Sequence, residues 1–300
     1  MIYHVNGETQ AYTYNISGSS LNVAYDINKN IVYPDESQSR LKVMTYNVGQ
    51  WYEGGGVNVP ADKDAIYYAM HDGILSANRP DILMIEEYWK ILSKTGRTAK
   101  SMLERYFPYV HEQGGDSGYF GRCICSKYPI SDYTVNLYST EQERYYDSCT
   151  VSINGKTITL VVTHLGLSVE AREPQIQELI EYLSNLDSFI CCGDYNTPYS
   201  WNSTPRSETV TEITQFLSAG FNLANCGDLG NFITSVGTDI SSDGLTVPDG
   251  VWRGWIDNVS SSSDLVPVAA HVDIRKISEL QSGNITKIDH MPFVAEYDLE

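Results

Sequence analysis

The sequence predicts an α/β fold, and three observations support this prediction. Apolar segments at 41–48 and 82–85 flank residues 62–78, whose apolar side chains recur at helical spacing. A strand, a helix and a second strand in this order favour neighbouring parallel strands. Residues 189–192 are four consecutive apolar residues, which predicts a strand buried on both faces. The 300 residues, 42% of them hydrophobic, suffice for one large α/β domain or two small ones with an ample core.

Residues 1–38 differ from the rest of the chain and are predicted to form a short β-rich N-terminal extension. Tyr3, Tyr14 and Tyr25 recur every 11 residues, which indicates three hairpin-like repeats. A segment this small has no core of its own, so we expect it to pack on the main domain, 39–300, or to mediate attachment. A floppy extension in which the periodicity arises by chance is the alternative.

The remaining elements alternate between strands and helices. Asn154-Gly155 is the strongest short hairpin signal and joins strands predicted at 145–153 and 156–163. Residues 176–183 have the spacing of an amphipathic helix that precedes the strand at 189–192. The other predicted elements are helices at 101–106 and 207–219, strands at 118–125, 255–259, 266–274 and 291–295, and a surface excursion at 225–255.

Composition narrows the possible functions. The formal charge of -18, from 20 basic and 38 acidic residues, disfavours broad electrostatic attraction to nucleic acid or to anionic membranes. A phosphate-bearing substrate stays possible, because divalent metals can supply positive charge locally. No apolar run approaches the roughly 18 residues of a membrane span, and the N-terminus lacks the regions of a signal peptide, so a cytoplasmic protein without stable membrane insertion is expected. The six cysteines include no Cys-x-x-Cys pair, which favours reduced, buried thiols over disulfides or a zinc site.

Polar residues terminate most of the predicted apolar strands, and loops at strand ends are where sites collect in α/β sheets. This set is rich in oxygen, has two imidazoles and lacks a thiolate, which favours Mg²⁺ or Mn²⁺ over zinc. Such an inventory suits attack of water on a phosphoester. A strand that simply ends in a turn is the alternative for 193–196, because Gly, Asp and Asn all favour turns. The set comprises Asn47, Glu87, His164, Asp194, Asn196, Asp257, Asp289 and His290.

Seven short motifs in a fixed order resemble those of the endonuclease/exonuclease/phosphatase (deoxyribonuclease I-like) superfamily. The resemblance covers about residues 40–299, and motifs that are weak singly are strong in this order. It implies a four-layer α/β/β/α sandwich of two mixed sheets with outer helices. The motifs are Thr45-Tyr46-Asn47, Pro80-Asp81 with Glu87, Gly121 with Ser126 to Ile130, Thr163-His164-Leu165, Gly193-Asp194-Tyr195-Asn196, Ile256-Asp257 and Asp289-His290.

The resemblance also implies roles for individual residues around the metal. Glu87 is similar to the principal metal ligand, with Asn47 and Asp289 assisting. Asp194 is similar to the residue that positions or deprotonates the attacking water. Asn196 is similar to the residue that holds the phosphate.

The two histidines of the motifs have counterparts in the superfamily as well. His290 resembles the imidazole that binds phosphate or acts as acid and base, oriented by Asp257. His164 resembles the second histidine of the deoxyribonuclease and sphingomyelinase branches. The pattern departs from the superfamily at Glu86, where a glutamine is usual, and at Ile288, where a serine is usual.

Substrate contacts are expected outside these motifs. Arg122 either contacts phosphate or pairs with an acid, and the sequence leaves both open. All five tryptophans lie near the motifs, which suggests an aromatic rim that stacks on a base, ring or lipid head group; Trp51 and Trp201 are the candidates.

The predicted function is a metal-dependent phosphoester hydrolase, foremost a phosphodiesterase or nuclease. A sphingomyelinase-like or inositol-phosphate phosphatase that acts on a lipid or sugar head group is the alternative within the same chemistry. The alternative from another class is a non-catalytic binding or attachment protein. In such a protein the 11-residue repeats would mediate binding, and the predicted site would have lost its catalytic activity. The substrate is expected to be a nucleic acid, a phosphorylated small molecule or a lipid head group.

Overall fold

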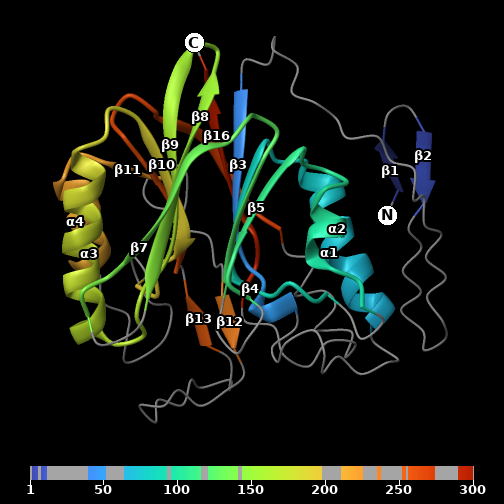
Figure 1. Cartoon of the computed structure of the whole chain (residues 1–300), viewed down its shortest axis with the longest axis horizontal. Coiled ribbons are helices and arrows are strands. Elements are labelled where there is room, and N and C mark those ends of the chain that lie inside the picture. Colours follow the sequence, from blue (N-terminus) through green and yellow to red (C-terminus); the bar gives the residue numbers. More distant parts are fainter. Residues whose placement is uncertain are drawn as a thin grey trace.

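The structure is a computed structural model in which most of the chain can be described. The described residues are 2–5, 8–11, 40–51, 64–92, 96–115, 121–140, 144–197, 211–225, 235–237, 252–254, 256–273 and 290–299. Two six-stranded sheets dominate them (Figure 1).

The first sheet has the strand order β15-β16-β3-β4-β6-β5. Its strands are β3 (Arg40–Asn47), β4 (Ile82–Tyr88), β5 (Tyr109–Gln113), β6 (Gly121–Ser126), β15 (Pro267–Val272) and β16 (Phe293–Asp298). β3 and β4 are parallel, as their separation by a helix predicts, and the other pairs are antiparallel. The sheet is therefore mixed.

The second sheet has the order β11-β14-β10-β9-β8-β7. Its strands are β7 (Ser131–Leu137), β8 (Tyr145–Ile153), β9 (Lys156–His164), β10 (Phe189–Asp194), β11 (Asn222–Leu223) and β14 (Asp257–Ser261). β9 and β10 are its parallel pair. The β8–β9 hairpin turns at Asn154 and Gly155, which both have positive φ, 52° and 81°, as the predicted tight turn requires.

The two sheets pack face to face, and alternation along each strand divides the side chains between two layers. On β10, Ile190 and Cys192 belong to the core between the sheets. Phe189 and Cys191 belong to the layer under the helices. A strand covered on both faces needs apolar residues at every position, which explains the continuous apolar run.

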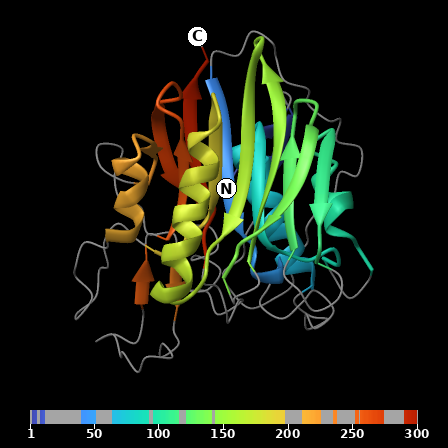
Figure 2. The same cartoon turned by 60° about the vertical axis from the view of Figure 1, so that its left-hand side comes forward.

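Helices cover the outer faces of both sheets (Figure 1). α1 (Asp64–Asn78) and α2 (Ala99–Leu103) pack on the first sheet, where Ile74 and Leu83 belong to one buried cluster. α3 (Val169–Ser184) and α4 (Thr211–Ser218) pack on the second sheet, and Figure 2 shows α3 running along it. The predicted four-layer α/β/β/α sandwich is confirmed.

Two edge strands, β5 and β7, were not predicted from the sequence. Every residue of β7 is exposed or only partly buried, so the sequence has no apolar run that would indicate a strand there. Pairing with β8 forms it instead. The helix expected at 101–106 lies slightly earlier, at α2. The five described cysteines are buried and free, as predicted.

Short strand pairs lie outside the sandwich. β1 (Ile2–Val5) and β2 (Glu8–Ala11) form an antiparallel pair, and β12 (Ser235–Gly237) pairs with β13 (Trp252–Gly254). The repeats predicted at Tyr14 and Tyr25 lie outside the described residues, and the boundary at residue 38 stays a prediction. In the described part of the chain, every helix is too short or too polar to cross a bilayer.

Candidate active site

Five of the predicted site residues meet at one edge of the sandwich. Asn47, His164 and Asp194 are the last residues of β3, β9 and β10. Asp257 begins β14, which pairs antiparallel with β10 and places Asp257 opposite Asp194. His290 lies just before β16, which pairs antiparallel with β3. Parallel strands end, and antiparallel neighbours begin, at the same edge, so topology gathers these side chains.

A bulge at the end of β4 brings Glu87 to the same place. The pairing of β4 with β6 skips from Ile85 to Tyr88, and Glu87 has a φ of 50°. Alternation would send Glu87 away from the face that carries Glu86, but a bulge re-aims the side chain. As a result Glu87 Oε1 accepts a hydrogen bond from Asn47 Nδ2 at 3.2 Å.

The carboxylate of Asp194 is the centre of the site. Its Oδ2 atom lies 3.1 Å from Asn47 Nδ2, 3.4 Å from His164 Nε2 and 3.3 Å from His290 Nε2. Its Oδ1 atom accepts the backbone N–H of Asn196 at 2.9 Å. Four nitrogen atoms therefore hold this side chain in one orientation.

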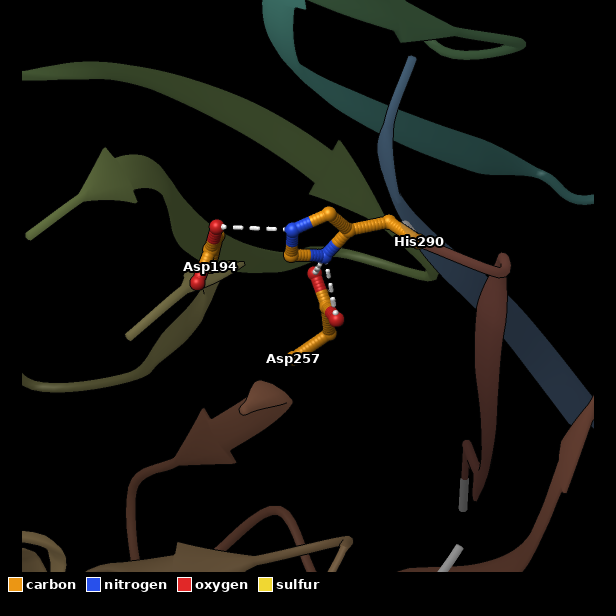
Figure 3. A group of neighbouring side chains, drawn as sticks. All are labelled: Asp194, Asp257 and His290. Carbon is orange, nitrogen blue, oxygen red and sulfur yellow. Dashed lines mark hydrogen bonds and ion pairs between the residues drawn. The ribbon is translucent and has the colours of Figure 1, made fainter. Parts of the chain in front are cut away.

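Asp257 fixes the orientation of His290. His290 Nδ1 lies 2.8 Å from Asp257 Oδ2 and 3.1 Å from Oδ1 (Figure 3). A carboxylate only accepts, so Nδ1 carries the proton, and Nε2 points at Asp194. The contact between Asp257 and His290 is thus present in the structure, and the function of Asp257 in catalysis stays a prediction.

Burial of several carboxyl groups together changes their protonation. Burial raises the pKa of Asp194 to about 7; His290 opposes the shift, while Asp257 and Glu87 add to it. Glu86 is fully buried, and burial followed by the charge of Asp257 raises its pKa well above the usual value. Glu86 ends an apolar run, where a carboxylate is commonly solvated, but the structure buries it.

His164 is held as a neutral imidazole. Burial lowers its pKa well below the usual value, and the charge of Arg144 acts in the same direction. Burial also lowers the pKa of Arg144, while Asp194 and Glu87 oppose that shift. Sequence reasoning missed Arg144, because it precedes a predicted strand and belongs to none of the motifs. Its charge partly offsets the carboxylates of the site.

Asn196 lies beside Asp194 in a constrained conformation. Its φ is 50°, and its side-chain Nδ2 donates to the carbonyl of Leu165 at 2.9 Å. Asn adopts left-handed backbone more readily than most residues, and such conformations cluster at functional sites. The amide is thereby held between the loops that follow β9 and β10.

The structure corrects part of the predicted substrate contacts. Trp51 is only 2% exposed and packs edge-on against His71 and Tyr88, so its indole belongs to the core and not to a rim. Arg122 Nη2 pairs with Asp147 Oδ1 at 2.8 Å, which is the acid pairing that the sequence left open. Trp201 and Asp289 lie outside the described residues.

His71 belongs to none of the motifs, and it does not lie on the surface. It is fully buried on α1. His271, which is also outside the motifs, has its Nε2 3.1 Å from Asn78 Oδ1.

Comparison with known proteins identifies the chain. The Endonuclease/Exonuclease/phosphatase family matches residues 44–278. The chain belongs to this family. The uncharacterized protein YbhP of Escherichia coli K12 is 25% identical over 178 residues, which cover 54% of this chain and 70% of YbhP.

Solved structures agree with the fold of the family. The D. rerio TDP2 complexed with a single-strand DNA product has a TM-score of 0.61 at 17% identity, over 87% of this chain and 100% of that one. A Leptotrichia buccalis member of the family has a TM-score of 0.59 at 18% identity, over 86% and 100%. The human Nocturnin catalytic domain with a bound sulfate anion has a TM-score of 0.58 at 14% identity, over 88% and 96%.

Members of the endonuclease/exonuclease/phosphatase family typically depend on a divalent metal, and the donor set at this edge fits such an ion. Asp194, Asp257 and His290 each offer a ligand atom, and these atoms lie within 4.8 Å of one another. Carboxylates that raise one another's pKa indicate a site whose negative charge a cation would neutralise.

Proposed function

We propose that this chain is a divalent-metal-dependent phosphodiesterase whose catalytic domain spans residues 39–300. The observation that carries the proposal is the position of Asp194 Oδ2, within 3.4 Å of Asn47 Nδ2, His164 Nε2 and His290 Nε2. These four residues come from three separate strands and from the segment before β16, and the packing of a core does not require polar groups to converge in this way.

We assign Asp194 to the attacking water. Its carboxylate is fixed by surrounding nitrogen atoms, and a pKa of about 7 suits a group that takes a proton near neutral pH. His290, held by Asp257, presents Nε2 to the same space and would donate to a phosphoryl oxygen. Neutral His164 and the amide of Asn196 would position that phosphate.

We place the metal on Glu87, with Asp289 as an expected second carboxylate and Mg²⁺ or Mn²⁺ as the ion. The hydrogen bonds of Asp257 to His290 occupy both of its oxygens, which favours Glu87 over Asp257 as a ligand. The bound ion would supply positive charge to the phosphoryl oxygens. Asn47 donates from Nδ2 to Glu87 and Asp194, while its Oδ1 accepts from Gly49 N–H at 3.0 Å. In this state Asn47 orients the carboxylates, and ligation through Oδ1 would require the amide to turn.

Single-stranded nucleic acid is the first substrate to test, because the structurally similar TDP2 is complexed with a single-strand DNA product. The formal charge of -18 opposes long-range attraction to polyanions. We therefore expect short, single phosphodiesters to be cleaved more readily than long duplex DNA.

A panel of phosphoesters tests the proposal. Purified protein is assayed with Mg²⁺ or Mn²⁺ at millimolar concentration, and separately with EDTA. The substrates are single-stranded DNA, RNA, a bis-aryl phosphodiester, sphingomyelin and inositol phosphates, each at up to about 1 mM, the upper end of typical KM values. We expect metal-dependent hydrolysis of at least one diester that Asp194→Asn abolishes. Cleavage of a lipid or inositol phosphate alone would select the head-group alternative. Full activity in EDTA, or in Asp194→Asn, would refute the proposal.

A further inference from the structure

A turn with left-handed backbone begins two residues after Asn47. Gly49, Gln50 and Trp51 have φ values of 54°, 54° and 71°. Two consecutive non-glycine residues in this region are unfavourable, so surrounding contacts must hold the turn. The turn also fixes the side-chain amide of Asn47, because Gly49 N–H donates to Asn47 Oδ1 at 3.0 Å. With Oδ1 occupied, Nδ2 faces Glu87 and Asp194.

His71 on α1 bridges the two sides of this turn. Its Nε2 lies 2.7 Å from the carbonyl oxygen of Trp51, and its Nδ1 lies 2.9 Å from the hydroxyl of Tyr46. A carbonyl only accepts, so Nε2 is the donor, and Nδ1 of the neutral ring accepts from Tyr46. The imidazole therefore connects the residue before Asn47 to the end of the turn.

Trp51 extends the connection to the chain segment that carries Glu87, the proposed metal ligand. Its Nε1 donates to the carbonyl oxygen of Trp89, and its ring meets Tyr88 edge-on with centroids 5.8 Å apart. Tyr88 and Trp89 directly follow Glu87. The buried His71 and Trp51 thus tie together the chain segments that carry Asn47 and Glu87.

We propose that His71 is a positioning residue of the active site. Through the Trp51 carbonyl it fixes the left-handed turn that aims the Asn47 amide at Glu87 and Asp194. This inference rests on the proposed function in so far as Asn47 and Glu87 serve metal-dependent hydrolysis. Outer partners of metal-site residues typically affect metal affinity or activity by about 10- to 100-fold.

Two amide substitutions separate the two contacts of His71. The glutamine amide nitrogen reaches the place of His Nε2, so His71→Gln can still donate to Trp51. The asparagine oxygen reaches only the place of Nδ1, so His71→Asn keeps an acceptor for Tyr46 and loses the contact with Trp51. Both variants remove the ring, so a purely structural function of His71 predicts similar losses in both.

We measure kcat, KM and the Mn²⁺ concentration for half-maximal activity, together with Tm. For His71→Asn we expect kcat to fall and the Mn²⁺ requirement to rise by about tenfold or more, with KM changed less than about threefold. His71→Gln is expected to stay within about threefold of wild type in all three. His271→Asn, which alters another hydrogen-bonded histidine, is the control and should leave the Mn²⁺ requirement unchanged.

Wild-type kcat and Mn²⁺ requirement in His71→Asn, or equal losses in both His71 variants, would overturn the inference. If His71→Asn does not fold, His71→Gln alone tests the inference. A fall in its kcat of about tenfold or more would then overturn the inference. If wild type neither cleaves any phosphoester nor binds Mn²⁺, the proposed function fails, and a crystal structure of His71→Asn still tests the positioning. An Asn47 amide that remains on Glu87 and Asp194 there overturns it.

Discussion

The Nδ1 atom of His290 lies 2.8 Å from Oδ2 of Asp257, and both residues are buried. This contact selects one tautomer of the imidazole and directs Nε2 toward Asp194. The pair is thus arranged so that one carboxylate orients the histidine and a second carboxylate faces its other nitrogen.

Replacement of Asp257 by asparagine tests this orientation. To donate from Nε2 to a phosphoryl oxygen while Nδ1 donates to Asp257, the ring of His290 must carry a proton on both nitrogens. Asparagine removes the negative charge that stabilises this cation, and its N–H can instead turn Nδ1 into an acceptor. We expect kcat to fall by about 10²- to 10⁴-fold with little change in KM. Steady-state kinetics on the best diester of the panel measures this effect.

Asp264→Asn is the matched control for Asp257→Asn. Asp264 follows the opposite end of β14 and pairs with Lys156 at 2.7 Å on the surface. Its loss should leave kcat unchanged. Wild-type kcat in Asp257→Asn would show that His290 needs no orienting carboxylate.

Glu87→Gln tests the proposed metal residue. The amide keeps the size of the side chain but removes its charge, so we expect metal-dependent hydrolysis to fall by about 10³-fold. Differential scanning fluorimetry should also show that saturating Mn²⁺, which at 100 times its Kd stabilises wild type by about 2.7 kcal/mol, no longer raises Tm. Glu104→Gln, on the exposed end of α2, is the control. Equal Tm shifts in wild type and Glu87→Gln would place the ion elsewhere.

The stability of the metal-free protein should depend on pH through Asp194. Its folded pKa is raised to about 7 from an ordinary value of 3.8, so the folded state binds the proton more tightly than the unfolded chain. The resulting stabilisation is present below about pH 4 and is lost as pH rises through about 7. The slope approaches about -1.4 kcal/mol per pH unit between these values.

Urea unfolding in EDTA from pH 5 to 8 measures this dependence. His164 has a lowered pKa and contributes the opposite slope below about pH 6.5, so wild type must be compared with Asp194→Asn. We expect the stability of wild type relative to the variant to decrease as pH rises. A difference that is constant over this range would contradict the raised pKa.

Gly193→Ala should disrupt both the fold and the site. A Cβ atom at Gly193 would lie 2.0 Å from the carbonyl oxygen of Thr163 on the neighbouring β9. The strands would have to separate where His164 and Asp194 pair, so we expect a loss of about 3 kcal/mol or more in the free energy of unfolding. Chemical denaturation measures it. Gly220→Ala, at a φ of 84° with open space around it, should cost only about 1 kcal/mol.

The strands that carry the site could be predicted from the sequence. The apolar run at 189–192 and the alternation at 41–48 mark β10 and β3, because burial on one or both faces selects the residues directly. Parallel pairing of β3 with β4 followed from the intervening helix. The edge strands β5 and β7 could not be predicted, because every residue in them is exposed or only partly buried and burial therefore selects no apolar pattern.

Some residues of the site could be predicted from the sequence, and others could not. Asn47, His164 and Asp194 stand where apolar strands end, so their place was visible in the sequence. The contacts of His71 were not, because a histidine on a helix has the same local sequence whether it faces solvent or a backbone carbonyl. Trp51 was assigned to a rim for the same reason, since its nearness to Asn47 in sequence says nothing about the direction of its ring.

The sequence by itself determined the order of the helices and of the buried strands, the family motifs and the set of polar groups at the strand ends, because each depends on residues close together in the chain. Only the tertiary structure decided which oxygen faces which nitrogen. The bulge at Glu87 and the left-handed conformations of Gln50 and Trp51 occur at residues with no local preference for them. They persist because contacts from distant segments outweigh the local backbone energy, and such contacts exist only after the two sheets have packed together.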